Sequence, residues 1–268
     1  LAEDERRARE IYEDYRFYDK KIYLYPARDL LFFQADIHGN LLIRQRMQVV
    51  RALMEEKELA VVTSIDGCMD FLESLEQIRE QLLHFTSDST VNIDALKARL
   101  VWLGYERVGQ VEMPGQFSIR GGIVDIYCLT EENPWRIELW GDEIDSIRSF
   151  DAESQRSLEN LEEITIYPAV EHPGEKAKLS FLDYFPAQKS VIFLDEPNRL
   201  VEKGQAVEEE YRQSRLHRAE KGEKNLPENW LCSFEKVQKE LNRRNCIALC
   251  ALEPRQAGWK INEKFYIE

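Results

Sequence analysis

The sequence predicts an α/β protein in which a parallel α/β layer is interrupted by a β-rich α+β insertion and is then resumed. Near both ends of the 268-residue chain, short apolar runs alternate with amphipathic helical segments, an order that is typical of a parallel sheet. Between them, residues 115–151 alternate polar and apolar side chains and are broken by glycine-containing pairs, which is typical of an antiparallel meander.

The N-terminal part predicts helices and strands in alternation. The helices are expected at residues 2–15 and 41–56, the strands at 21–25 and 59–63, and a loop at 36–40 ends in Asn40 as a helix cap. A doubly wound unit normally begins with a strand, whereas the first expected element here is a helix. The chain is therefore expected to lack the first strand of its layer.

The pattern of the sequence changes at about residue 83, where the alternation of helices and apolar strands stops. A polar linker is expected at 86–90, and a helix at 93–103 with Asn92 as its cap. The expected strands of the meander cover residues 116–120, 123–127, 135–140 and 143–150, and a returning strand covers 164–168. Gly121-Gly122 and Gly141-Asp142 are expected to form two of the turns.

The strand expected at 135–140 has two different faces. Period-two geometry places Trp135, Ile137 and Leu139 on one side and Arg136, Glu138 and Trp140 on the other. The aliphatic side fits the core better. The other side then presents an arginine and a tryptophan together, which is the composition of protein-binding hot spots. The alternative is a tryptophan that lies flat over its own strand neighbours.

Helices and apolar strands resume in the C-terminal part. The helices are expected at residues 177–184, 199–221 and 234–244, the strands at 190–194 and 246–249, and a charged loop rich in structure breakers at 220–229.

Composition excludes several classes of protein. The net charge is −14 with a pI near 5, which argues against strong DNA binding because phosphate contacts need an excess of cations. The five cysteines are scattered and form no C-x-x-C pair, so we expect no metal site and reduced thiols in the cytoplasm. No apolar run approaches the roughly 18 residues that a membrane helix needs.

One segment resembles a catalytic motif. Residues 191–196 read VIFLDE, so an apolar strand ends in Asp195 and Glu196, as in the Walker B pattern that holds magnesium. The chain has no G-x-x-x-x-G-K-[ST] phosphate loop to accompany it. The alternative is a strand that simply ends where a helix begins. A nucleotide-binding enzyme and a DNA-binding, helicase-like domain both remain open as alternatives.

Four segments together resemble one family. They are LYPARDLLFFQADIHGNLLIRQRMQVVRAL (24–53), LGYERVGQVEMPGQFSIRGGIVDIY (103–127), WRIELWGDEIDSIRSFDAESQRSL (135–158) and VIFLDEP (191–197). In these four segments the sequence resembles the amino-terminal, UvrB-like region of the bacterial transcription-repair coupling factors (Mfd). The order of the segments extends this resemblance over nearly the whole chain.

The resemblance implies a three-part organisation. Residues 1–86 would be domain 1a without its first strand, 87–166 the UvrA-docking domain 2, and 167–268 domain 1b. Domains 1a and 1b would form a helicase-like layer of the degenerate P-loop NTPase type. The implied role is recruitment of UvrA in nucleotide excision repair, with no catalysis and no cofactor in this part. The full-length proteins of the family are ATP-dependent DNA translocases, whose downstream domains are expected to cover the docking surface in an autoinhibitory contact.

The resemblance also implies which residues contact UvrA. They are Arg120 in FSIRG, Arg136 and Glu138 in WRIELW, Trp140 where the family commonly has Phe, Arg107 in GYERV, and Phe117. Ser118 stands where UvrB proteins carry a further arginine, so the UvrB-like contact set is incomplete. The stretch 25–37 is too short for the aromatic hairpin with which UvrB clamps DNA.

The first prediction concerns nucleotide. Because Asp195 and Glu196 have no phosphate loop beside them, we expect the chain neither to bind nor to hydrolyse ATP at physiological concentration. Calorimetric titration with magnesium-ATP should give no heat of specific binding, and a micromolar dissociation constant would contradict the prediction.

Overall fold

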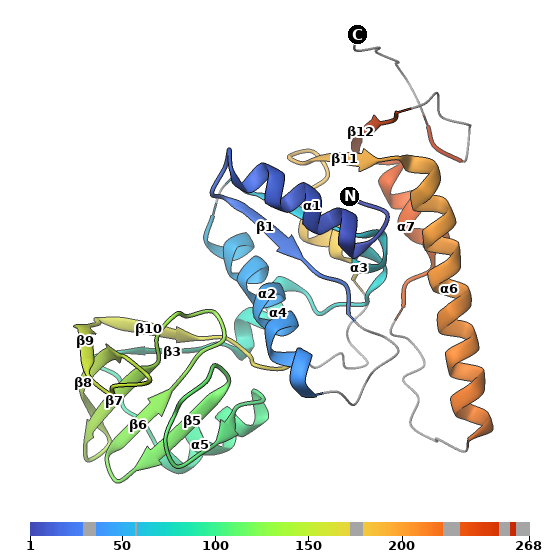
Figure 1. The fold of residues 1–268 in the computed structure, drawn as a ribbon. Coiled ribbons are helices and arrows are strands. Elements are labelled where there is room, and N and C mark those ends of the chain that lie inside the picture. The colour runs from blue at the N-terminus through green and yellow to red at the C-terminus, as the bar shows by residue number, and fades with distance from the viewer. Residues whose placement is uncertain (29–35, 57, 172–178, 222–230, 252–257, 261–268) are drawn as a thin grey trace. The chain divides into compact units, whose positions relative to one another are not determined.

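The computed structural model describes residues 1–28, 36–56, 58–171, 179–221, 231–251 and 258–260. The chain forms two compact units, each built from segments that are distant in sequence (Figure 1). Unit 1 comprises residues 1–34, 52–74 and 173–268, and unit 2 comprises residues 35–51 and 75–172. This grouping reflects contacts rather than family domains, so the three-part division at residues 86 and 166 stays a prediction.

Unit 1 contains two pairs of parallel strands. β1 (Ile22–Tyr25) pairs with β2 (Ala60–Thr63), and β11 (Val191–Asp195) pairs with β12 (Asn245–Leu249). The expected parallel pairing is therefore found, but a helicase-like layer is not confirmed, because the described strands of unit 1 form two-stranded sheets.

The first two residues lie between these pairs. The Ala2 nitrogen donates to the Thr63 carbonyl oxygen at 2.9 Å. The Leu1 nitrogen donates to the Phe193 carbonyl oxygen at 2.6 Å, and the Asp195 nitrogen donates to the Leu1 carbonyl oxygen at 2.9 Å. A two-residue segment thus links β2 to β11 at the position of a central strand.

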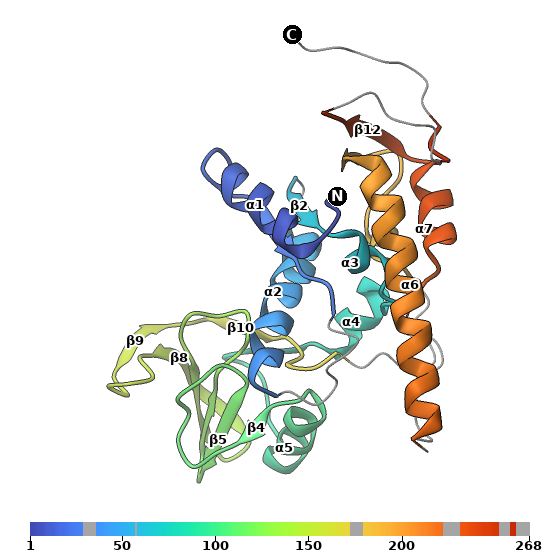
Figure 2. The same ribbon diagram turned by 45° about the vertical axis from the view of Figure 1, so that its right-hand side comes forward.

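Several helices of unit 1 lie beside its strands (Figure 2). Their bounds are α1 Glu5–Arg16, α3 Ile65–Met69, η1 Phe181–Tyr184, α6 Pro197–Glu220 and α7 Phe234–Leu241. Asp4 caps α1 by accepting from the Arg7 nitrogen at 2.8 Å. Buried Ala8 of α1 packs against Ile22 and Val62, so the helical spacing read from the sequence does mark a core-facing side.

Unit 2 is organised around a six-stranded sheet in the order β4-β5-β6-β7-β8-β9. The strands are β4 Glu106–Arg107, β5 Gln116–Arg120, β6 Ile123–Ile126, β7 Trp135–Trp140, β8 Glu143–Phe150 and β9 Ser157–Asn160. β4 runs parallel to β5 and the other neighbours are antiparallel. The meander predicted from period-two alternation is confirmed.

Helix α5 (Ile93–Trp102) contributes buried Leu96 and Leu100 to the core of unit 2. The Asn92 side chain accepts from the Ala95 nitrogen at 2.9 Å, which confirms the predicted cap.

The first part of α2 (Asp36–Glu55) belongs to unit 2 and is held there by arginines. Arg46 is fully buried, and its Nε donates to Glu171 at 2.8 Å. Arg51 donates to Glu131 at 2.5 Å. Buried cations need such partners, so these pairs fix the helix against the rest of unit 2.

Several expected boundaries were wrong. The predicted loop 36–40 is the first turn of α2. The linker expected at 86–90 is preceded by β3 (Leu83–Thr86), which pairs antiparallel with β10 (Glu163–Ile166). The polar strand β9 and the short helix α4 (Leu75–Gln81) were not predicted. Pairing with distant segments, rather than local periodicity, creates β3 and β9.

Two C-terminal expectations are changed or fall elsewhere. Of the stretch 177–184 that was expected to be helical, residues 179–184 are described, and within them only Phe181–Tyr184 form a helix, the 3₁₀ helix η1. Most of the loop expected at 220–229 lies outside the described residues.

The connections of the meander depend on glycine. Gly121 and Gly141 have φ of +61° and +66°, which glycine adopts without steric cost. Gly122 has a different constraint: its carbonyl oxygen accepts from the Leu139 nitrogen at 2.8 Å, and a Cβ atom on it would lie 2.9 Å from the Leu139 carbonyl oxygen. Close approach of β7 therefore requires glycine at this position.

We predict that Gly122→Ala lowers the stability of unit 2 by about 1–3 kcal/mol, because the added methyl group meets backbone that cannot move without shifting β7. Chemical denaturation followed by tryptophan fluorescence would measure the change. Gly109→Ala is the matched control, because a Cβ at Gly109 meets nothing within 4 Å, and it should shift stability by less than about 0.5 kcal/mol. Equal effects of the two substitutions would contradict the explanation.

Candidate protein-docking surface

One face of the unit 2 sheet gathers polar side chains. The register places Asp125 of β6 opposite both Ser118 of β5 and Arg136 of β7. Ile123 lies in the same way opposite Arg120 and Glu138. Residues directly opposite one another in an antiparallel sheet point to the same side, so these residues from three strands share one face, here called the polar face.

The opposite face is the core of the unit. Phe117, Val124, Ile126 and Ile137 are 0% exposed, and Trp135 is 7% exposed. This burial confirms that the aliphatic side of β7 faces inward. It also corrects the expectation for Phe117: the side chain is inside the core and is not available to a partner, because residue 117 alternates with the polar face residues Ser118 and Arg120.

Arg136 was expected to be exposed, and this was wrong. Its side chain is 13% exposed and grips the Asp125 carboxylate through two hydrogen bonds, from Nε to Oδ1 at 2.6 Å and from Nη2 to Oδ2 at 2.9 Å. The Asp125 side chain is itself 1% exposed. Hydrogen bonding to this carboxylate raises the pKa of Arg136 above its ordinary value, so the guanidinium stays charged.

The last residue of β8 and the segment after it help to enclose Arg136. Its guanidinium carbon lies 4.4 Å from the centre of the buried Phe150 ring, a cation–π arrangement. Its Nη2 also donates to the Gln155 side-chain oxygen at 3.0 Å. Gln155 has a positive φ of 61° and donates to the Ala152 carbonyl oxygen at 2.8 Å. These contacts explain why one end of the polar face is covered.

Arg120 reaches the same carboxylate from the other end of the polar face. Its Nη2 donates to Oδ2 of Asp125 at 2.7 Å, and its side chain is 47% exposed. Two guanidinium groups therefore share one buried carboxylate, and the cluster of Arg120, Asp125 and Arg136 carries one net positive charge. Arg120 is the member of this cluster that solvent or a partner can reach.

Trp140 is 83% exposed, as predicted, at the end of β7. The hydrogen bond between Leu139 and Gly122 places the Gly121-Gly122 turn beside this end of β7. Arg120 directly precedes that turn, so Arg120 and Trp140 lie toward the same end of the polar face. The flat alternative, with the tryptophan covered by its strand neighbours, does not agree with this exposure.

The two remaining predicted contacts differ in their surroundings. Glu138 is 30% exposed and forms an ion pair with Arg148, and it accepts from the Ser146 hydroxyl at 3.2 Å. Arg107 is exposed in the two-residue strand β4 and is paired in register with Phe117. The structure thus brings Arg120, Arg136 and Glu138 to one face, with Arg107 on a neighbouring strand.

The predicted Walker B-like acids lie in unit 1 and are already engaged. Asp195 accepts from Nε of Arg7 at 2.8 Å and from Nη2 at 3.4 Å. Glu196 adopts φ 52° and accepts from the Ala251 nitrogen at 2.7 Å. The hydrogen bond to Asp195 raises the pKa of Arg7. These contacts favour the alternative reading, in which both acids stabilise the fold.

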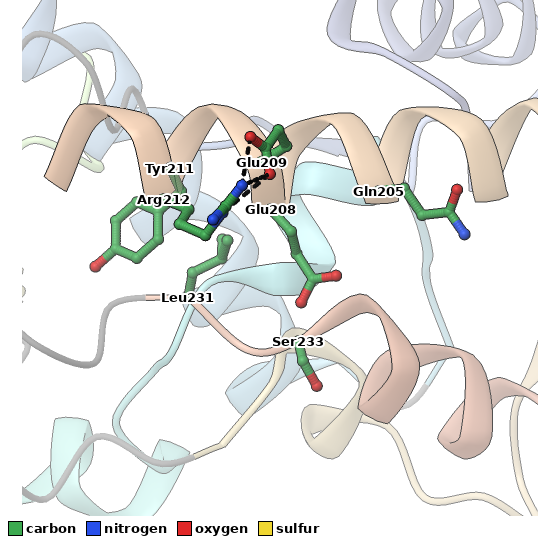
Figure 3. A pocket seen from close by; sticks show the side chains of 7 residues that line it. All are labelled: Gln205, Glu208, Glu209, Tyr211, Arg212, Leu231 and Ser233. Atoms are coloured by element: carbon green, nitrogen blue, oxygen red, sulfur yellow. Dashed lines mark hydrogen bonds and ion pairs between the residues drawn. The ribbon is translucent and has the colours of Figure 1, made fainter. Parts of the chain in front are cut away.

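A pocket of about 470 Å³ opens beside α6 in unit 1 (Figure 3). It is lined by Gln205, Glu208, Glu209, Tyr211, Arg212, Leu231 and Ser233. Figure 3 shows the Arg212 guanidinium against Glu209, to which it donates at 2.7 to 3.0 Å. The hydroxyl of Ser233 accepts from the Lys236 nitrogen at 3.3 Å. These groups serve local structure, and the pocket contains none of the predicted site residues.

The described part of the chain holds no group of three or more His, Cys, Asp or Glu side chains that could bind a metal ion. Across the same residues, no helix is both long and apolar enough to cross a membrane.

Asp125 is the functional candidate that the sequence analysis missed. The signal was present in the run IVDIY, where a lone acid interrupts apolar residues in a strand. An acid at such a position is seldom buried unless it is paired, so its partners could have been sought among nearby arginines.

Comparison with known proteins agrees with this geometry. Residues 83–172, which include the whole six-stranded sheet, match the family model described as UvrB interaction domain. The chain is 40% identical over 163 residues to the transcription-repair-coupling factor of Bacillus subtilis (strain 168), an alignment that covers 60% of this chain and 14% of that protein.

Staphylococcal relatives give the same result. The transcription-repair-coupling factor of Staphylococcus aureus (strain bovine RF122 / ET3-1) is 35% identical over 153 residues, which is 57% of this chain and 13% of that protein. The protein of that name from Staphylococcus haemolyticus (strain JCSC1435) is 34% identical over 152 residues, again 57% and 13%. The chain thus matches only a small part of the length of these relatives. The predicted resemblance to the transcription-repair coupling factors is confirmed: residues 83–172 match the UvrB interaction domain model, and the chain is similar over more than half of its length to proteins named transcription-repair-coupling factor.

Proposed function

We propose that this chain is the UvrB-like docking module of a transcription-repair coupling factor and that it recruits UvrA to stalled transcription complexes in nucleotide excision repair. The observation that carries the proposal is Trp140, which is 83% exposed at the open end of the polar face. It lies within the residues that match the UvrB interaction domain. Partner binding accounts for a large aromatic side chain left in water on a rigid sheet.

The chemistry of this end suits a protein partner. Trp140 offers a large apolar area with few rotatable bonds, so little conformational entropy is lost when it is buried. Arg120 uses one nitrogen on Asp125 and has further N–H groups in its planar fork for a carboxylate of UvrA. Glu138 would then add a charged contact at the rim of this end, and Arg107 one from β4 at the edge of the sheet. Charged groups at the rim affect specificity more than affinity.

Two further parts of the proposal concern the full-length protein. Its downstream domains would cover the same surface until the motor engages polymerase, so that covering and docking compete and the population shifts between two states. The chain would act in the cytoplasm, without catalysis, cofactor or strong DNA binding. The contacts of Asp195 with Arg7 and of Glu196 with Ala251 support a structural rather than a hydrolytic role for that acid pair.

The central test is Trp140→Ala. We expect it to weaken the binding of UvrA by about thirtyfold or more, equivalent to ~2 kcal/mol, because a desolvated aromatic anchor is lost. Calorimetry or surface plasmon resonance with purified UvrA would measure it. The thermal midpoint should hardly change, because exposed side chains contribute little to stability.

Phe17→Ala is the matched control for this test. Phe17 is also 83% exposed but lies in unit 1, directly after α1, so its loss should leave UvrA binding unchanged. Failure of the unsubstituted chain to bind UvrA, or normal binding by the Trp140 variant, would contradict the proposal.

A separate prediction concerns Arg136→Ala. Because Arg136 is almost enclosed and grips a buried carboxylate, its removal should destabilise unit 2 by about 3 kcal/mol through the partly unpaired charge of Asp125. Urea denaturation would measure the loss. Arg107→Ala, which removes an exposed arginine from a neighbouring strand, should change stability by less than about 0.5 kcal/mol. An Arg136 variant as stable as the unsubstituted chain would rule out a structural role for the ion pair.

A further inference from the structure

We propose that Asp125 is a positioning residue of the docking surface: it holds the guanidinium of Arg120 in place for an acidic group of the partner, and Arg136 acts through Asp125 rather than by touching the partner. The inference rests on the proposed docking function and adds to it a residue and a division of labour that the family resemblance does not supply.

Both arginines bind the carboxylate of Asp125. Oδ2 of Asp125 accepts from Nη2 of Arg136 at 2.9 Å and from Nη2 of Arg120 at 2.7 Å, while Oδ1 accepts from Nε of Arg136 at 2.6 Å. One carboxylate therefore joins the two arginines. Each contact is charge-assisted and is short, as such bonds are.

The three side chains of the cluster differ in burial. The exposed fraction of the side chain is 1% for Asp125, 13% for Arg136 and 47% for Arg120. A partner that approaches the polar face can therefore reach Arg120 but not the carboxylate beneath it. Arg136 is held on the side of the carboxylate where the Phe150 ring and the Gln155 side chain also contact it, and its Nε and Nη2 atoms already donate within the unit.

The sheet holds the Asp125 carboxylate in a fixed position. Asp125 lies on β6, which has β5 on one side and β7 on the other. A carboxylate on an inner strand that is also gripped by Arg136 is a fixed acceptor. An arginine tied to a fixed acceptor loses less side-chain entropy on binding than a free one, and such preorganisation increases affinity.

The net charge of the cluster determines which ligand it can bind. Two guanidinium groups and one carboxylate leave one positive charge on the cluster. Without Arg136, Asp125 would neutralise Arg120 and the pair would offer a partner no net charge. With Arg136 present, Arg120 can accept a second carboxylate. The ligand expected at this point is therefore one Asp or Glu side chain of the partner, bound by the outward N–H groups of Arg120.

The test is a double-mutant cycle between Asp125→Asn and Arg120→Ala, with the dissociation constant for UvrA measured by calorimetry. We expect Asp125→Asn alone to weaken binding about tenfold. In the Arg120→Ala background the same change should weaken it by less than about twofold, because nothing is left to position. Asp145→Asn, the same change at an exposed aspartate of β8, is the matched control and should leave binding unchanged.

A merely structural role for Asp125 would give a different result. Its loss would then weaken binding by the same factor with or without Arg120, and this additive outcome would overturn the proposal, as would Asp125→Asn that binds as well as or better than the unsubstituted chain.

Arg120→Lys provides a second test of the proposal if the Asp125 variant does not fold. It changes a half-exposed side chain and keeps the charge, but an ammonium group lacks the planar fork that can serve Asp125 and a partner carboxylate together. We expect about fivefold weaker binding at an unchanged thermal midpoint, and binding equal to that of the unsubstituted chain would also overturn the proposal.

The Trp140→Ala variant separates this inference from the docking function itself. If the unsubstituted chain captures UvrA, the Trp140 variant loses it and the cycle is additive, docking stands and the positioning role falls. If the unsubstituted chain does not capture UvrA, both are overturned.

Discussion

The Asp125 carboxylate is the interaction on which the polar face of unit 2 depends. It is buried on an inner strand, and its two arginines come from the strands on either side. A buried charge without such partners would destabilise the fold, because desolvation of a carboxylate costs several kcal/mol. Pairing it with two cations rather than one also leaves a positive charge at the surface. A single buried acid thereby couples the stability of the sheet to the electrostatics of its exposed end.

The two ends of the polar face differ because different segments follow the strands there. At one end Phe150 and Gln155 close over Arg136. At the other end, the connections 121–122 and 141–142 are two-residue hairpin turns, too short to fold back over the sheet. Trp140 and Arg120 adjoin these turns and stay accessible. Loop length along the chain thus decides which part of a uniform sheet face can meet a partner.

Unit 1 illustrates a different constraint. Its strands pair in parallel, which needs long crossover connections, and residues 1–2 link the two pairs by backbone hydrogen bonds. Asp195, which looks catalytic in sequence, lies at the end of β11 and is neutralised by Arg7 of α1. The acid at the strand end is thus explained by the ion pair that it forms.

Much of the architecture and part of the site could be predicted from the sequence, because both follow from local patterns. Alternation over residues 116–150 determined the strands and their two faces, since a strand exposes every second side chain on each side. Asn92 determined the start of α5 through a hydrogen bond within one turn. The exposure of Trp140 followed from the aliphatic side of β7 facing the core.

Only the tertiary structure decided which of the polar face residues are accessible to solvent. Arg136 and Trp140 have the same parity on β7, and alternation treats them alike. The enclosure of Arg136 depends on Asp125, Phe150 and Gln155, of which the last two come from beyond the next hairpin. The strands β3 and β9 depend in the same way on distant partners. Periodicity reports which way a side chain points, whereas its accessibility depends on what other segments place above it.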